Sequence, residues 1–550
     1  MAEVRRWRRR SDRKRRRLDA AAALGWGTVV PTERIVDLLH AVIRPGDRVV
    51  LEGDNQKQAD FLSRALVTVD PLRTHGLHML IPSISRAEHV DLFERGIASR
   101  IDFSYAGPQS ARVAALLAEG AMTVGAIHTY LELYARLFVD LIPDIALVAA
   151  EQADATGNLY TGPNTEDTPT IVEATAFRSG IVIAQVNQVV TGDRLPRVDI
   201  PGDWVDFVVV ADRPCQIEPL FTRDPSQITD LHVLLAMLAI RGVYERHQVT
   251  SLNHGIGYDT AAIELLLPTY GQRLGLRGKI ARNFVLNPHP TLIPAIESGW
   301  VDTVTSFGGE VGMERYVAAR PDVFAVGRDG SLRSHRMIAQ TAGLYAADMF
   351  IGSTLQIDTE ANSSTVTDSR LSGFGGAPNL GSDARGRRHP TPAWLSLARG
   401  TGDLGTERGR KLVVQIAESY GAAGRPKYVE RLDAIAVGRN AGMPLTPVMI
   451  YGDDVTHVVS EEGVAYLYRA RDLEERREAV AALAGVGPVG RRSTRDHREA
   501  LRRDGILALP EDLGVRRSDA SRSLLAARSV DELVVWSRGL YEPPTRFRPW

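Results

Sequence analysis

The sequence contains almost no cysteine: Cys215 is the only one among 550 residues. This excludes an internal disulfide framework and a zinc site built from paired cysteines. A chain with so little cysteine is typical of a reducing compartment, so we expect a cytoplasmic protein. No partner motif surrounds Cys215, and we predict that it is structural rather than reactive.

Long apolar runs, excess charge and the common nucleotide motifs are also missing. No apolar stretch reaches the roughly 18 residues that a membrane-spanning helix needs. The formal net charge is −1, which gives no reason to expect a nucleic-acid or membrane partner. There is no Walker phosphate loop and no His-Glu-x-x-His helix, and Gly255-x-Gly257 lacks the third glycine of a dinucleotide fingerprint. We therefore expect no metal and no tightly bound cofactor.

Positive charge is concentrated at one place, the first seventeen residues, which hold ten of the 66 lysines and arginines. No apolar core follows directly, so this segment does not resemble a secretory signal. Residues 1–20 are interpreted either as a flexible, solvated arm or as a docking arm for an acidic partner.

The rest of the chain alternates short apolar strands with helical segments. Strands are expected at Arg48–Leu51, Ile181–Val186 and Phe207–Val210, and later at Met349–Ile357 and Thr446–Tyr451. Short, nearly continuous apolar strands between helices indicate parallel sheets that are covered on both faces. The sequence predicts an α/β fold with two similar halves, 21–228 and 229–473, and a peripheral, helical, arginine-rich appendage at 474–550.

A glycine turn lies at the start of the second half, where Asn253-His254-Gly255-Ile256-Gly257 precedes an apolar helical run. A Gly-x-Gly turn before a helix leaves backbone N–H groups unpaired, and the helix dipole adds positive partial charge there. We predict that Gly255 and Gly257 polarise a carbonyl under attack; a plain structural turn is the alternative. Asn253 and His254 flank the turn, and His254 either donates to a carboxylate or is hydrogen-bonded locally.

Several segments resemble the family I coenzyme A transferases. The resemblance rests on Ser251–Gly257, on Gly373–Leu380 (GFGGAPNL), on Val455–Ala465 (VTHVVSEEGVA), and on Gln185–Gln188 with Leu195–Val198. Tyr258 stands where the family usually has proline. The resemblance implies two CoA-transferase-like halves, each a mostly parallel sheet covered by helices, with the active site between them.

One departure from that family concerns its catalytic glutamate, which follows a strand end and forms an acyl-enzyme. The matching region here reads Phe284-Val285-Leu286-Asn287-Pro288-His289, without a carboxylate. An amide cannot replace a carboxylate nucleophile. Asn287 is therefore expected either to hold substrate or merely to cap the strand, and direct attack of the substrate acid on the thioester is the expected route.

Nearly the whole chain resembles the alpha subunits of malonate decarboxylase, most clearly at 45–62, 157–177, 373–394 and 539–550. The resemblance implies an acyl-carrier-protein transferase that converts acetyl-S-ACP and malonate into malonyl-S-ACP and acetate. It also implies a carrier with a dephospho-CoA-derived prosthetic group and separate carboxyltransferase-like decarboxylase subunits. A free-standing CoA transferase for short acids and a non-catalytic scaffold subunit are the alternatives.

This chemistry suggests two further groups of site residues. The glycine-rich loop is expected to wrap the carrier arm through Gly373, Gly375, Gly376, Ala377 and Asn379, with a structural turn as the alternative. A dicarboxylate needs cations, and arginine binds carboxylates in a bidentate manner. Arg197 and Arg385 are the candidates, against the alternative that they are ordinary surface residues.

Overall fold

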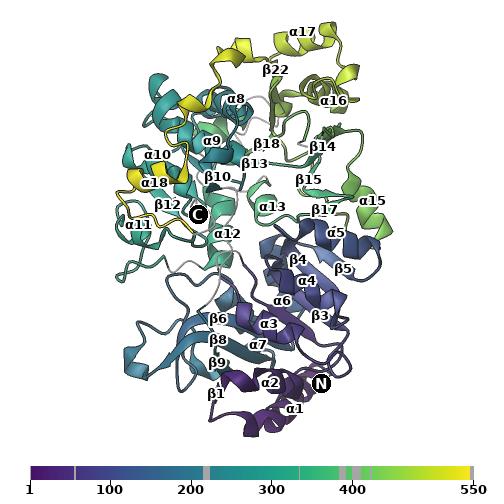
Figure 1. Ribbon diagram of the computed structural model, residues 1–550. Coiled ribbons are helices and arrows are strands. Elements are labelled where there is room, and N and C mark those ends of the chain that lie inside the picture. Colours follow the sequence, from purple (N-terminus) through teal and green to yellow (C-terminus); the bar gives the residue numbers. More distant parts are fainter. Residues whose placement is uncertain are drawn as a thin grey trace.

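The computed structural model describes residues 2–54, 57–214, 223–332, 335–382, 392–398, 410–421 and 424–544. Two α/β halves lie one above the other in Figure 1, the first purple to blue and the second teal to yellow. Cys215 and Arg385 lie outside the described residues, so the predictions for them stay predictions.

The first half is built on a nine-stranded sheet in the order β1-β9-β8-β6-β2-β3-β4-β5, with β7 paired to β6. Every pairing is parallel except that of β7. The strands are β1 (Val29–Val30), β2 (Arg48–Leu51), β3 (Leu77–Ser83), β4 (Ala98–Tyr105), β5 (Thr123–Ile127), β6 (Ile145–Asp154), β7 (Leu159–Tyr160), β8 (Ile181–Val190) and β9 (Phe207–Val210).

Helices cover both faces of this sheet, which explains why its strands are apolar at successive positions. On β2, Val49 and Leu51 belong to one hydrophobic core and Val50 to another, because alternate side chains point to opposite faces. The helices are α1 (Ala2–Ala21), α2 (Ile35–Val42), α3 (Asp60–Val67), α4 (Ala87–Glu94), α5 (Ser110–Ala118), α6 (Tyr130–Val139) and α7 (Thr168–Ala176).

The basic segment forms α1, which packs beside α2 at the lower end of the molecule in Figure 1. Three of its cations bind the first half: Arg17 pairs with Asp47 at 2.8 Å, Lys14 with Asp206 at 2.9 Å, and Arg10 donates to a backbone carbonyl. The interpretation as a flexible arm is therefore wrong, because these ion pairs anchor the helix. Its other face remains exposed.

The second half has an eight-stranded sheet in the order β12-β11-β10-β13-β18-β20-β21-β22. It is parallel from β12 to β20 and antiparallel at β21 and β22. Its strands are β10 (Ser251–His254), β11 (Asn283–Val285), β12 (Thr303–Thr305), β13 (Met349–Ser353), β18 (Leu412–Ile416), β20 (His457–Ser460), β21 (Gly463–Tyr466) and β22 (Leu507–Ala508). Two α/β halves are thus confirmed.

Two predicted strands differ from the structure. The expected strand at Met349–Ile357 is divided into β13 and β14 (Gln356–Asp358). Residues 446–451 form no strand, only an isolated bridge from Ile450 to Ser363, and Pro447 has no N–H to donate to a ladder. The remaining short strands are β15 (Ser363–Ser364), β16 (Val366–Thr367), β17 (Arg370–Leu371) and β19 (Tyr428–Val429).

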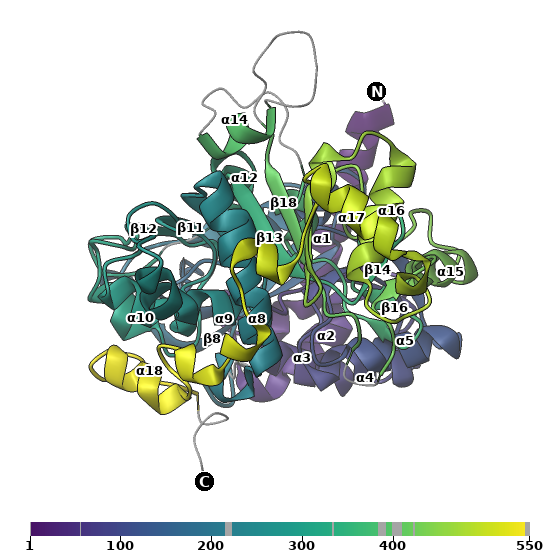
Figure 2. The ribbon, with the colours of Figure 1, turned by 90° about the horizontal axis from the view of Figure 1, so that it is seen from above.

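The C-terminal segment is helical, as predicted, but it is not peripheral. Its strand β22 extends the second sheet, and α18 packs against α10 (Figure 2), with Leu533 fully buried. The helices of this half are α8 (Asp230–Ala239), α9 (Tyr258–Leu266), α10 (Ile293–Glu297), α11 (Glu314–Ala318), α12 (Arg336–Ala346), α13 (Ala377–Leu380), α14 (Pro392–Ala398), α15 (Asp433–Asn440), α16 (Leu473–Leu483), α17 (Arg495–Arg503) and α18 (Val530–Trp536). None of the helices in the described residues is long and apolar enough to cross a membrane.

Candidate active site

The glycine turn connects β10 to α9, as the sequence predicts, but the N–H of its first glycine already donates a hydrogen bond within the protein. The Gly255 N–H donates to the Ile351 carbonyl at 2.7 Å, which continues the pairing of β10 with β13. A Cβ at Gly255 would lie 3.0 Å from the Cα of Gly352, so the close approach of the two strands requires glycine. The predicted role of the Gly255 amide in polarising a carbonyl is therefore wrong.

The next two amides, of Ile256 and Gly257, lie at the N-terminus of α9. Neither donates a hydrogen bond within the described part of the chain. Ile256 borders the cavity described below and is 45% exposed, whereas Gly257, the next residue, is outside its lining. Because the N-terminus of a helix carries positive partial charge, these two N–H groups are the available donors for an oxyanion.

His254 is fully hydrogen-bonded to protein groups. Its Nε2 lies 2.6 Å from the Tyr244 hydroxyl and its Nδ1 lies 2.8 Å from Glu264, which also binds His289. Burial opposes ionisation of Glu264, but His289 and His254 hold the pKa of this carboxyl well below its usual range. The alternative of local hydrogen bonding thus describes His254, which positions the turn.

The two asparagines differ in their contacts. Asn253 donates to the Val285 carbonyl and so connects β10 to β11. The Oδ1 atom of Asn287 is buried and accepts no hydrogen bond within the described chain. Asn287 borders the cavity and is free to bind a polar ligand.

A cavity of about 230 Å³ lies between the two halves. The second half contributes the glycine turn, the segment around Asn287 and the loop at 373–377, and the first half contributes Asp54 and Tyr130. In Figure 1, α12 and α13 lie at this junction, above α6 of the first half. The structure therefore brings the two glycine segments to one site.

The glycine-rich loop also holds the halves together. Phe374 and Gly375 donate their N–H groups to the Ser104 carbonyl at 2.7 and 2.9 Å, and the Tyr130 N–H donates back to Gly375 at 3.1 Å. Gly373, Gly375, Gly376 and Ala377 border the cavity, whereas Asn379 lies outside its lining. The structural role of this loop is thus established, and a role in binding the carrier arm is a separate proposal.

Gly373→Ala is expected to destabilise the protein more than Gly375→Ala. Both glycines have positive φ, +74° and +58°, but a Cβ at Gly373 would lie 2.4 Å from the Ser104 carbonyl oxygen, whereas at Gly375 the nearest atom is 3.5 Å away. The strained backbone costs about 1–3 kcal/mol in each variant, and only Gly373→Ala adds a backbone clash. Thermal unfolding of the pair measures the difference, and equal midpoints would contradict this packing.

Arg197 does not reach the cavity. It binds Asp199 at 2.6 Å and Asp329 at 2.5 Å, donates to the Gly162 carbonyl, and stacks over the Tyr160 ring. All of these groups lie away from the cavity lining. Arg197 therefore joins the two halves, and the prediction that it binds the substrate is wrong.

A different arginine, Arg336 at the start of α12, borders the cavity and is only 3% exposed. It lies 3.0 Å from Asp54 and 3.1 Å from Asp167, and it also binds Glu166. The Tyr130 ring covers it at 5.1 Å. This cluster places one cation among three buried carboxyls beside the cavity.

Gln340 lies one helical turn after Arg336 and is 1% exposed. Both its amide nitrogen and its amide oxygen are without a partner among the described residues, and it borders the cavity. Buried polar atoms are normally hydrogen-bonded, so unpaired atoms at a cavity wall indicate a polar ligand.

The model of the family "Malonate decarboxylase, alpha subunit, transporter" matches residues 6–550 of this chain. The chain belongs to this family. A Malonomonas rubra protein named acetyl-S-ACP:malonate ACP transferase is 56% identical over 529 residues, 95% of both chains.

Solved structures of malonate decarboxylase agree with this assignment. A chain of a Pseudomonas malonate decarboxylase hetero-tetramer, solved in complex with malonate, is 64% identical over 99% of both chains with a TM-score of 0.95. The alpha subunit from Acinetobacter baumannii is 59% identical, with a TM-score of 0.94 over 98% of this chain and all of that one. The citrate lyase alpha subunit of Streptococcus mutans, 16% identical with a TM-score of 0.56, shares the CoA-transferase-like fold.

In this malonate decarboxylase alpha-subunit family member, sequence reasoning missed Arg336 and Gln340. They lie on a helix whose pattern resembles that of any half-buried helix, so no local signal marks them. A signal was present for Glu166 and Asp167, which fall inside the 157–177 stretch that carried the resemblance.

The carboxyls around Arg336 give this member of the malonate decarboxylase alpha-subunit family a pH-dependent stability. Burial raises the pKa of Glu166 and of Asp167 to about 7, Arg336 opposes this, and Asp54 adds to it. A carboxyl whose pKa is raised by folding stabilises the protein below its unfolded pKa, and this stability is lost as the pH rises through the folded pKa.

We therefore expect Glu166→Gln, which is neutral at every pH, to become more stable relative to the parent as the pH rises from 4.5 to 7. Thermal midpoints of both proteins across this range measure the effect. Glu119→Gln, at the exposed end of α5, is the control. Its thermal midpoint is expected to differ from that of the parent by the same amount at every pH. A constant difference for Glu166→Gln as well would contradict the shifted pKa.

Proposed function

We propose that this protein exchanges acyl groups on an acyl carrier protein: acetyl-S-ACP and malonate give malonyl-S-ACP and acetate. The observation that carries the proposal is the cavity between the halves, where a helix N-terminus and unpaired amide side chains border one space. The name of the Malonomonas rubra relative describes the same exchange.

The exchange proceeds by direct attack of malonate on the carrier thioester. One malonate carboxylate oxygen adds to the acetyl carbonyl carbon, and the Ile256 and Gly257 N–H groups stabilise the resulting oxyanion. The carbon–sulfur bond breaks and releases the carrier thiolate, which leaves an acetyl–malonyl anhydride. The thiolate then attacks the malonyl carbonyl and expels acetate, so no proton has to be moved.

The cavity wall supplies the groups that hold malonate. Gln340 offers the N–H groups of its unpaired amide nitrogen to a carboxylate, and Arg336 supplies positive potential. Asn287 borders the same space. Protons retained on Glu166 or Asp167 near neutral pH leave Arg336 less fully neutralised, which favours a dianion.

The carrier arm, a dephospho-CoA derivative, is proposed to lie along Gly373, Gly375, Gly376 and Ala377. The carrier protein and carboxyltransferase-like decarboxylase subunits are the proposed partners, in the cytoplasm, with no tightly bound cofactor. The exposed face of α1 carries Arg9, Arg13 and Arg16 and is available to an acidic partner.

Reconstitution with carrier protein bearing a ¹⁴C-acetyl thioester tests the function. Release of labelled acetate should require malonate, and mass spectrometry should show malonyl-S-ACP. No stable label on the protein is expected, because no nucleophilic carboxylate occupies position 287. Asp54 is the single carboxylate that borders the cavity in the described residues, and label on Asp54 would replace direct attack with an acyl-enzyme route.

The position of Asp54 at the cavity favours a second candidate function, a free-standing CoA transferase with an acidic nucleophile. That activity predicts turnover of soluble acetyl-CoA at a rate comparable to that of the carrier, and its loss in Asp54→Asn. A non-catalytic scaffold predicts instead that Gly257→Val changes neither transfer nor assembly.

A further inference from the structure

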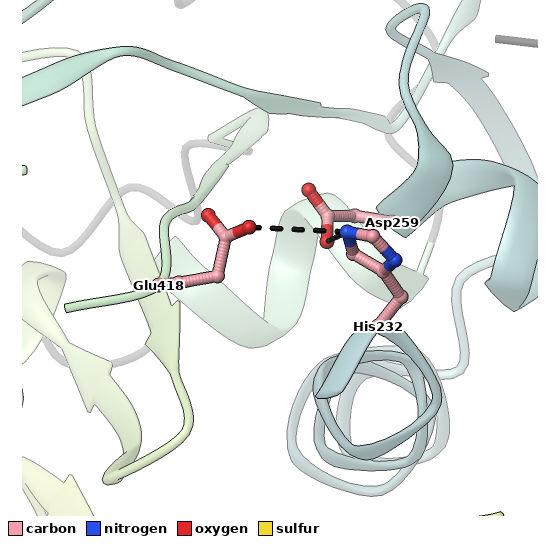
Figure 3. Close-up of side chains that lie close together, drawn as sticks. All are labelled: His232, Asp259 and Glu418. Carbon is pink, nitrogen blue, oxygen red and sulfur yellow. Dashed lines mark ion pairs between the residues drawn. The ribbon is translucent and has the colours of Figure 1, made fainter. Parts of the chain in front are cut away.

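A cluster outside the cavity lining joins three side chains at the carboxyl edge of the second sheet. His232 comes from the first turn of α8, Asp259 from the first turn of α9, and Glu418 from the segment after β18. Figure 3 shows the three side chains pointing toward one another. They are distant in the sequence, and no motif links them.

The spacing of their polar atoms suits an ion better than direct hydrogen bonds. His232 Nε2 lies 4.0 Å from Asp259 Oδ1 and 3.8 Å from Glu418 Oε1, and all three atoms lie within 4.8 Å of one another. A charge-assisted hydrogen bond closes to about 2.7–2.9 Å. An ion about 2.0–2.3 Å from each ligand atom separates those atoms by about 3–4 Å, which small side-chain rotations reach here.

Asp259 supplies an independent indication of a ligand. Its side chain is buried, with the residue 4% exposed, and its Oδ2 accepts a hydrogen bond from Ser353 Oγ at 2.5 Å. Its Oδ1 accepts none within the described chain and faces His232. A buried carboxylate oxygen without a donor is costly unless a cation satisfies it.

We propose that His232 Nε2, Asp259 Oδ1 and Glu418 Oε1 bind one divalent transition-metal ion, Mn²⁺ or Zn²⁺. One imidazole nitrogen with two carboxylate oxygens is a mixed ligand set that favours these ions over Ca²⁺. The Thr229 backbone N–H donates to His232 Nδ1 at 3.0 Å, and Thr229 Oγ1 lies 3.1 Å from the same nitrogen. Metal binding through Nε2 requires the ring proton on Nδ1, which then donates to Thr229 Oγ1 and replaces the bond from the Thr229 N–H. This proposal revises the expectation that the chain binds no metal and does not depend on the proposed function.

The competing explanation is an ion network without metal. Lys427 binds the other oxygen of Glu418, and in this network the Nε2–H of His232 faces Asp259 Oδ1 and Glu418 Oε1. In that network Lys427 stabilises the Glu418 carboxylate, whereas in a metal site it competes with the ion for Glu418. Replacing Lys427 with a neutral residue therefore distinguishes the two explanations.

The ion would position the oxyanion donors without touching the substrate. Asp259 follows Gly257 by two residues, and its partner Ser353 borders the cavity. Binding Asp259 and Glu418 together would fix the start of α9 relative to the ends of β13 and β18. His232, Asp259 and Glu418 are thus positioning residues.

Metal content and stability test the site. The full chain is stripped with a chelator and titrated separately with Mn²⁺, Zn²⁺, Mg²⁺ and Ca²⁺, following bound metal by mass spectrometry and the thermal midpoint. We expect one equivalent of Mn²⁺ or Zn²⁺ per chain and a higher midpoint. Asp259→Asn and Glu418→Gln should weaken binding at least about tenfold, Lys427→Met should strengthen it, and His497→Gln, on the exposed α17, should leave it unchanged.

The two carboxylate variants are independent, so a folding defect in one leaves the other informative. The proposal is overturned if no cation binds the wild type, or if Glu418→Gln and Lys427→Met bind metal as the wild type does. Either result would favour the ion network without metal.

Discussion

Replacing Arg336 with methionine is expected to lower the free energy of unfolding by about 3–5 kcal/mol, because it leaves buried carboxyls without their cation. Asp54, Glu166 and Asp167 all lie around the guanidinium. Arg336 also opposes the raised pKa of Glu166 and Asp167. Without it these pKa values rise further, so the loss of stability should be larger at pH 8 than at pH 5.

Thermal and denaturant unfolding at the two pH values measure this effect. Arg315→Met is the matched control, because Arg315 pairs with Glu542 at the surface with both side chains more than half exposed. Surface ion pairs contribute roughly 0–1 kcal/mol, so the control should hardly change. A loss in Arg336→Met that is small, or equal at pH 5 and pH 8, would show that the carboxyls do not depend on this arginine.

Gln340→Leu is expected to leave stability unchanged or raise it, while malonate-dependent transfer falls about 10- to 100-fold. Both amide atoms of Gln340 are buried and unpaired, and an apolar residue of similar shape removes them at little cost. A hydrogen bond to a charged ligand contributes about 1.5–3 kcal/mol, and its loss accounts for the fall in transfer.

Unchanged or higher stability together with slower transfer would show that Gln340 binds the ligand and is not needed for folding. Gln415→Leu is the control, since Gln415 is also buried with an unpaired oxygen but lies on β18, outside the cavity lining. Transfer should be normal in that variant. A Gln340→Leu protein that loses stability and transfers normally would show that Gln340 only packs against Gly376.

The sequence predicted the elements whose patterns are local. Strand β2 is apolar at the successive positions Val49–Leu51 because both faces of its sheet are covered, and the glycine turn before α9 is a contiguous motif. The prediction for residues 446–451 failed because β propensity could not show that, in the described part of the chain, this segment would form a single bridge, to Ser363. Propensity describes a single segment, whereas a strand requires a neighbour.

The same limit applies to the candidate site. Motif residues of both glycine segments border the cavity, but the hydrogen bonds and ion pairs of each group depend on contacts between distant segments. The Gly255 N–H donates to the Ile351 carbonyl, and Arg197 forms an ion pair with Asp329 on the other half. Arg336 acquires its role only when α12 packs against the first half, so a pattern within one helix could not reveal it.

The hydrogen bonds from Phe374 and Gly375 to Ser104 have a mechanical consequence. They connect the glycine-rich loop of the second half to the end of β4 in the first half. The two halves therefore cannot separate at this point without breaking main-chain hydrogen bonds. The proposed carrier arm must therefore reach this space without separation of the halves, so the movement that the exchange requires is assigned to the carrier.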